Sequence, residues 1–105
     1  MRSGTTPTLE ISVDINVNQI SKIWVTFATK TGTEVLTKTK EDCEFSNGKI
    51  YVELSQADTL ALNPCKAVDC KNLLQVRILT TENKAYASAI KEINVERTLK
   101  EGVIS

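Results

Sequence analysis

The sequence predicts an all-β fold, an antiparallel β-sandwich of about seven strands with one short helical turn. Short stretches in which apolar and polar residues alternate recur along the 105-residue chain, and turn-forming residues separate them about every 8 to 12 residues. The sequence does not alternate strands with helices, as a parallel α/β fold would. We expect one domain over residues 1–105, because a chain of this length can bury roughly 60% of its unfolded surface or somewhat more.

The first strand is expected at residues 8–15, after a polar N-terminal arm. Residues 1–7 are small and polar and end at Pro7, which predicts a loosely held, flexible arm. From Thr8 onward every second residue is apolar, the period of a strand with one face buried. The apolar positions are Leu9, Ile11, Val13 and Ile15.

The central strand is predicted at residues 21–29, where three large apolar residues alternate with their neighbours. Ile23, Val25 and Phe27 are interleaved with Trp24, Thr26 and Ala28. Two Asn residues within 16–20 favour a turn before this strand, and Gly32 allows a tight hairpin into a strand at 34–39.

The clearest turn is the pair Asn47-Gly48, which is favoured in two-residue type I′ hairpins. This turn sets the register of the strand that follows. We expect the core to receive Ile50, Val52 and Leu54, with Lys49, Tyr51 and Glu53 on the opposite face.

A capping box predicts a short helical turn after this hairpin. Ser55 stands three residues before Asp58, and the apolar residues that follow are stopped at Asn63-Pro64. A turn at this place joins the two sheets of immunoglobulin-type sandwiches, so its position fits an immunoglobulin-like topology. The pattern is equally compatible with another seven-stranded sandwich.

The last third of the chain is expected to contain two further strands. Residues 65–72 are irregular in pattern, and residues 73–80 alternate with a second face that is only half polar, which indicates an inner strand. Residues 85–95 read as one long strand with a β-bulge near Lys91, because Ile90 is out of phase with Ile93. Residues 96–105 are predicted to form a C-terminal tail with one helical turn that ends at Gly102.

The composition disfavours several classes of partner. Thirteen basic and thirteen acidic residues cancel and are scattered, so we expect neither nucleic acid nor anionic membrane as a partner. No apolar run approaches the roughly 20 residues of a membrane span, and the N-terminus has no signal-peptide pattern. The protein is expected to be made in the cytoplasm.

Catalytic and metal-binding chemistry has little support in the sequence. Histidine is absent, which removes the usual general base and the commonest zinc partner of cysteine. Cys43, Cys65 and Cys70 form no CxxC pair and lack a fourth ligand, so we expect free thiols, no metal and no cofactor, with Cys43 in the core. Five carboxylates have no metal- or acid–base-type spacing: Asp14, Asp42, Glu44, Asp58 and Asp69. Asp58 is expected to cap the helical turn, and Asp42 and Asp69 to lie in turns.

Two aromatic residues and the chain ends are the candidate binding residues. Alternation places Trp24 and Tyr51 away from the core, where they are covered by a loop, contact another protein, or form a platform for sugar stacking. In the tail, Leu99, Val103 and Ile104 are apolar residues that the domain need not bury. Either end of the chain can fray, or can dock on a neighbour by strand pairing or by filling a groove.

Six segments carry a resemblance to a known family. They are Gly-Thr-Thr-Pro-Thr, Lys-Ile-Trp-Val-Thr-Phe, Asp-Cys-Glu, Leu-Ser-Gln-Ala-Asp-Thr-Leu, Gln-Val-Arg-Ile-Leu-Thr-Thr and Glu-Arg-Thr-Leu-Lys-Glu-Gly-Val-Ile. Over nearly the whole chain they resemble a family of small proteins from phages and prophages of gut Firmicutes. The expected fold is also similar to the immunoglobulin-like domains of phage tail and baseplate proteins.

The resemblance implies a non-enzymatic virion or virion-assembly protein, located in the virion, that binds capsid, tail or baseplate proteins or further copies of itself. No small-molecule substrate is expected. A carbohydrate-binding module for host attachment is the alternative, and it requires Trp24 or Tyr51 to be exposed. A small enzyme with a metal site at the cysteines is the third hypothesis.

Overall fold

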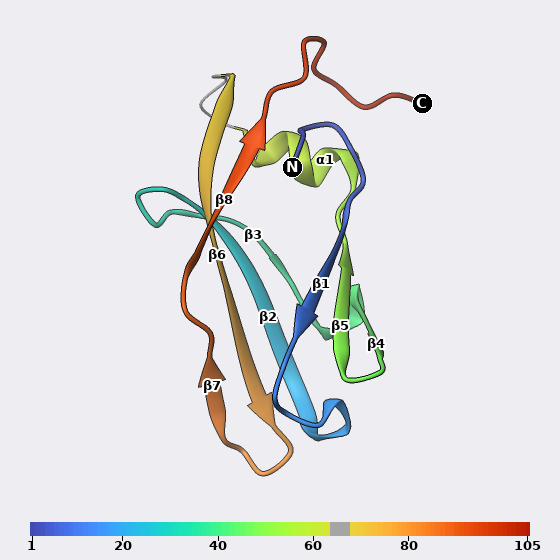
Figure 1. The fold of residues 1–105 in the computed structure, drawn as a ribbon, viewed down its shortest axis with the longest axis vertical. Helices are drawn as coiled ribbons and strands as arrows, with labels where there is room; N and C mark the ends of the chain where they lie inside the picture. Colours follow the sequence, from blue (N-terminus) through green and yellow to red (C-terminus); the bar gives the residue numbers. More distant parts are fainter. Residues whose placement is uncertain (64–67) are drawn as a thin grey trace.

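The computed structural model describes residues 1–63 and 68–105, which form two antiparallel β-sheets (Figure 1). The smaller sheet has the order β1 (Thr8–Ser12), β5 (Lys49–Glu53), β4 (Cys43–Ser46). The larger sheet has the order β3 (Glu34–Lys38), β2 (Ile20–Thr29), β6 (Asp69–Thr80), and β6 also pairs with both β7 (Ala85–Ala87) and β8 (Lys91–Glu96). The short helices are η1 (Val17–Gln19), η2 (Lys40–Asp42) and α1 (Gln56–Ala61).

The strand order confirms the predicted immunoglobulin-like sandwich. In that fold one sheet contains strands B, E and D and the other contains C, F and G, with C′ beside C in variable-type domains. Here β1, β5 and β4 occupy the places of B, E and D, while β3, β2, β6 and β7–β8 occupy those of C′, C, F and G. Within the described residues, no strand A lies beside β1. Instead, Arg2 forms a parallel bridge with Glu96 of β8.

Strand β2 is the central strand, as predicted. It pairs with β3 on one side and with β6 on the other, and Ile23, Val25 and Phe27 are almost completely buried. Asn16 caps the turn before it, because the Asn16 side chain accepts a hydrogen bond from the backbone N–H of Asn18 at 3.0 Å. The first strand, β1, ends at Ser12 rather than at residue 15.

The Asn47-Gly48 hairpin has the predicted geometry. Both residues have positive φ, 52° and 74°, as a type I′ turn requires, and Ser46 pairs with Lys49 across it. This register sends Ile50, Val52 and Leu54 into the core, where all are fully buried.

Helix α1 carries the chain from the smaller sheet to the larger one, as predicted. The capping box is complete: Ser55 Oγ accepts from the N–H of Asp58 at 3.1 Å, and Asp58 Oδ2 accepts from the N–H of Ser55 at 2.9 Å. At the other end, the Asn72 side chain donates to the carbonyl of Leu62 at 2.6 Å, which ties β6 to the end of the helix.

The segment after α1 is more regular than predicted where the structure describes it. Strand β6 begins at Asp69, so residues 69–72 are strand and Asp69 does not lie in a turn. Residues 64–67, which include Cys65, lie outside the described residues.

The predicted long strand at 85–95 is two strands. Three residues, 88–90, oppose two residues of β6, Gln75 and Val76, so the chain contains one extra residue between β7 and β8. Ser88 completes the hydrogen bonding there: its N–H donates to Val76 O at 2.8 Å, and its Oγ accepts from Val76 N–H at 3.0 Å. The predicted irregularity exists, but it interrupts the strand instead of bending it.

The N-terminal arm is bound to the domain, so the prediction of a loosely held arm is wrong. Ser3 is 2% exposed; its N–H donates to Glu96 O at 2.8 Å, and its Oγ accepts from Thr98 N–H at 3.1 Å. Thr5 exchanges two hydrogen bonds with Thr59 of α1, at 3.1 and 2.9 Å. All these partners are more than 50 residues away in the sequence, so local composition carries no sign of them.

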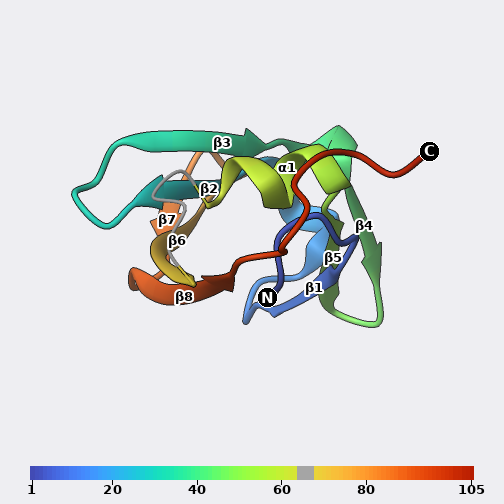
Figure 2. The same ribbon diagram turned by 90° about the horizontal axis from the view of Figure 1, so that it is seen from above.

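The C-terminal tail leaves β8 and crosses over α1 in an irregular path (Figure 2). Residues 97–105 contain no helical turn, so that prediction is wrong; Gly102 has a φ of 124°, outside the helical region. Ile104 and the side chain of Gln56 exchange two hydrogen bonds, at 2.8 and 3.1 Å. The tail therefore contacts the helix through its backbone rather than through its apolar side chains.

Candidate interaction surfaces

Trp24 lies on the outer face of the larger sheet. Because Val25 points into the core, its neighbour Trp24 points outward, and 51% of its surface is exposed. Arg77, its register partner on β6, places its guanidinium carbon 5.5 Å from the centre of the indole ring, in a cation–π contact. The alternative that a loop covers Trp24 is therefore wrong.

A shallow cavity of about 180 Å³ lies beside this indole. Its charged lining residues are Lys22 and Arg77, and no acidic side chain contributes to it among the residues described. The floor of the cavity is apolar. Such a surface can hold an apolar group and place a carboxylate or phosphate against the guanidinium.

Tyr51 and Trp24 lie on different sheets. Tyr51 is half-buried on β5, in the smaller sheet, with Glu10 and Glu44 as its register partners. Since Val52 next to it is in the core, Tyr51 points to the outer face of its own sheet. The two aromatic residues occupy the outer faces of different sheets, so they do not form one platform.

A groove runs between β1 of one sheet and β7–β8 of the other. It consists of two cavities of about 480 and 510 Å³ that share Ile11, Ser12, Val76 and Ser88. One end is lined by Leu9 and Lys91, and the other by Asp14, Ile15 and Tyr86. Below, "the groove" means these two joined cavities.

The groove lies where β1 and β7, the last strands of the two sheets, face each other with no strand between them among the residues described. On the opposite side, η2 carries the chain directly from β3 to β4, and Lys40 donates to Ile20 O at 2.9 Å. On the groove side, the free edges of β1 and β7 have no neighbouring strand within residues 1–63 and 68–105. The alternating residues of β1, such as Leu9 and Ile11, are consequently only half-buried. Sequence alternation predicted a buried face and gave no sign of an open side.

The tail presents the other apolar surface. Leu99, Val103 and Ile104 are 97%, 60% and 83% exposed. Arg97 and Glu101 form an ion pair at 3.7 Å within the tail. In Figure 2 the tail points away from the side where β1 and β8 lie. The tail therefore does not fill the groove of its own chain.

The cysteines differ from one another. Burial raises the pKa of the Cys43 thiol, and the charge of Asp42 raises it further, so this thiol stays protonated and is a weak nucleophile. Its Sγ donates to Thr39 O at 3.2 Å, and Cys43 is a free cysteine. Cys70 is disulfide-bonded, so the prediction of a free thiol is wrong there. Cys65 lies outside the described residues.

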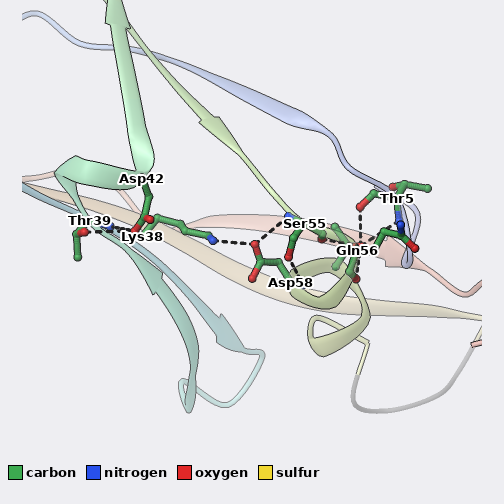
Figure 3. A network of polar contacts seen from close by, with 8 residues as sticks. Thr5, Lys38, Thr39, Asp42, Ser55, Gln56 and Asp58 are labelled. Atoms are coloured by element: carbon green, nitrogen blue, oxygen red, sulfur yellow. Dashed lines mark hydrogen bonds and ion pairs between the residues drawn. The ribbon is translucent and has the colours of Figure 1, made fainter. Parts of the chain in front are cut away.

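Asp42 and Asp58, two of the five carboxylates considered above, have structural contacts. Asp42 Oδ2 accepts from the N–H of Thr39 at 2.9 Å, and Lys38 Nζ lies 2.7 Å from Asp58 Oδ2, as Figure 3 shows. Within residues 1–63 and 68–105, no three His, Cys, Asp or Glu side chains gather as a metal site would require. In the same residues, no helix is long and apolar enough to cross a membrane.

Comparison with known proteins identifies no relative of this chain. No protein-family model, no curated protein and no solved structure matches this chain.

Proposed function

We propose that this protein is a non-enzymatic structural or assembly protein of a phage particle, where it binds other virion proteins. The observation that carries the proposal is the tail, whose Leu99, Val103 and Ile104 are left uncovered by their own domain. The resemblance to small phage proteins supports the virion as the setting. The neutral charge of the chain and the weak nucleophile at Cys43 favour an interaction protein over an enzyme.

The exposed tail is costly to leave in water. Full burial of a Leu, Val or Ile side chain is worth about 1.5–3 kcal/mol, and the three stand within six residues. Exposed apolar clusters of this kind mark protein contacts. A partner that covers them would gain binding free energy without unfolding any strand of the sandwich.

Mass spectrometry of density-purified particles from an induced lysogen tests the proposal. We expect peptides of this chain at a fixed ratio to the major capsid protein. A phage whose copy of this protein lacks residues 99–105 should incorporate less of it, while the matched variant Ser46→Asp, at an exposed position, should be incorporated normally. Absence of the protein from particles, with the protein present in the lysate, would contradict a virion role.

A carbohydrate-binding module remains the second candidate, because Trp24 meets the exposure that it requires. Arg77 covers one region of the indole, so a stacked sugar would have to share the ring with it. Titration with a panel of bacterial surface polysaccharides, followed by tryptophan fluorescence, should shift or quench the emission of the protein. Tyr51→Ala should leave such a response intact. An unchanged emission across the panel would remove this candidate.

A further inference from the structure

We infer that the groove between β1 and β7–β8 binds the C-terminal tail of a second copy of this chain, which adds to the smaller sheet as an extended strand. The groove lies where strand A lies in immunoglobulin-type sandwiches, beside the strand in the B position. A single copy leaves this place unfilled over most of its length. The inference names the partner within the proposed assembly role and rests on that role only for its biological setting.

The groove has the chemistry that an added strand needs. The free edge of β1 offers backbone N–H and C=O groups, and the alternating half-buried residues Leu9 and Ile11 provide a surface for every second side chain. Val76 and Ile78 of β6 form its apolar floor. Tyr86, 48% exposed at one end, would be covered by an occupant.

The arm shows the direction that an occupant takes. Arg2 pairs with Glu96 in parallel, so the chain there runs with β8 before it turns back into β1. A strand that continues this line through the groove runs parallel to β8 and antiparallel to β1. A strand with this orientation enters the groove at the Asp14 end and leaves it at the Leu9 end.

The tail matches this site in length and charge. Five residue steps separate Asp14 from Leu9, roughly 16 Å of extended chain, and residues 100–105 span the same length. With this direction, Lys100 enters beside Asp14, and neither residue belongs to an ion pair among the residues described. Val103 and Ile104 are adjacent, so in a strand they point to opposite faces, and one of the two enters the apolar groove.

The tail must come from another copy. It leaves the domain over α1, on the side away from the groove, and two exposed hydrogen bonds to Gln56 hold its end there. A formal net charge of zero removes long-range repulsion between copies. The tail of one copy and the groove of the next are different surfaces, so the contact is heterologous and adds copies head to tail.

Cysteine trapping tests the contact on the full-length protein in a Cys43→Ser background. One copy carries Glu10→Cys, on the exposed side of β1 and beside Ile104 in this register, and the other carries Ile104→Cys. We expect a disulfide between the two copies to form at least about tenfold faster than in the matched pair that carries Glu44→Cys, exposed on β4, in place of Glu10→Cys. Equal rates would overturn the second copy as occupant.

Sedimentation equilibrium provides the second measurement. Val103→Asp combined with Ile104→Asp should weaken self-association at least about tenfold, whereas Thr31→Asp combined with Ser46→Asp adds the same charge at exposed positions and should not. A wild-type protein that stays monomeric at millimolar concentration would overturn the inference. Because both measurements use purified protein, their failure leaves the virion role standing. Conversely, absence of the protein from particles would contradict the virion role but would leave the inference of self-association standing.

Discussion

Asp58 links two parts of the molecule through one carboxylate. It accepts hydrogen bonds from the N–H of Ser55 at 2.9 Å and from Lys38 Nζ at 2.7 Å, and so joins β3 to the start of α1 (Figure 3). Both side chains of the ion pair are about four-fifths buried, at 20% and 19% exposed. Burial alone would raise the pKa of Asp58, but the hydrogen bonds and the charge of Lys38 outweigh it and lower the pKa below 3.8.

Replacing Asp58 by Asn should lower the free energy of unfolding by about 1–2 kcal/mol at neutral pH, because Lys38 then keeps a partly buried charge without a carboxylate. The folded-state pKa is lower than the unfolded one, so the stabilisation is present above about pH 4 and disappears as the pH falls below it. Urea unfolding at pH 7 and pH 3 checks both points. Glu82→Gln, at an exposed turn, is the matched control. A deficit in Asp58→Asn that is equally large at pH 7 and at pH 3 would argue against the charge pair.

Gly48 is the residue with the simplest backbone requirement. Its φ of 74° is unfavourable for a residue with a Cβ, and an added Cβ would meet no atom within 4 Å. Gly48→Ala should therefore cost about 1–2 kcal/mol through the backbone alone, and Gly48→Asn should cost less because Asn tolerates this region. Thermal unfolding of the two variants measures the difference. Equal losses would indicate a cause other than the left-handed conformation.

At the scale of elements, the break between β7 and β8 shapes the groove. The extra residue there leaves Val76 without a regular strand neighbour, and Ser88 Oγ takes the place of the missing backbone acceptor at 3.0 Å. The edge that results is short and irregular, which disfavours uncontrolled pairing with other chains. Opposite this irregular edge, β1 provides an uninterrupted strand edge of five residues beside the groove.

Ser88→Ala should lower the free energy of unfolding by about 0.5–1.5 kcal/mol, because the N–H of Val76 loses the acceptor of its partly buried hydrogen bond. Ser88→Thr keeps a hydroxyl and is the matched variant. Hydrogen exchange followed residue by residue should show faster exchange of the Val76 amide in Ser88→Ala only. An unchanged Val76 amide would mean that the side chain of Ser88 is dispensable to this junction.

For the whole molecule, the two ends of the chain differ in what they contribute to stability. Removal of residues 99–105 should change the free energy of unfolding by less than about 1 kcal/mol, since its apolar side chains are exposed. Removal of residues 1–5 should cost about 3 kcal/mol or more, because Ser3 is buried and Thr59 loses both bonds to Thr5. Urea unfolding of the two truncated proteins checks the contrast, and similar losses would contradict it.

Features set by neighbouring residues were predictable from the sequence. Strand β2 follows from the alternation around Val25, and the hairpin at Gly48 follows from two residues. The bound arm and the groove depend instead on contacts such as Ser3 with Thr98, whose partners are 95 residues apart. Local patterns contain no information about such pairs. The exposure of Trp24 was predictable in part. Alternation predicts that Trp24 points to the outer face of its sheet, but whether a loop covers it depends on the tertiary fold.

The parallel contact between the arm and β8 also has a mechanical consequence. Ser3 N–H to Glu96 O and Glu96 N–H to Met1 O, at 2.8 and 2.7 Å, connect two segments that run in the same direction. A force that pulls the two chain ends apart slides these segments along each other and loads the bonds together, whereas an antiparallel pair would open one bond at a time. A copy held at its tail by its neighbour would thus transmit tension through the part of the domain that is best arranged to resist shear.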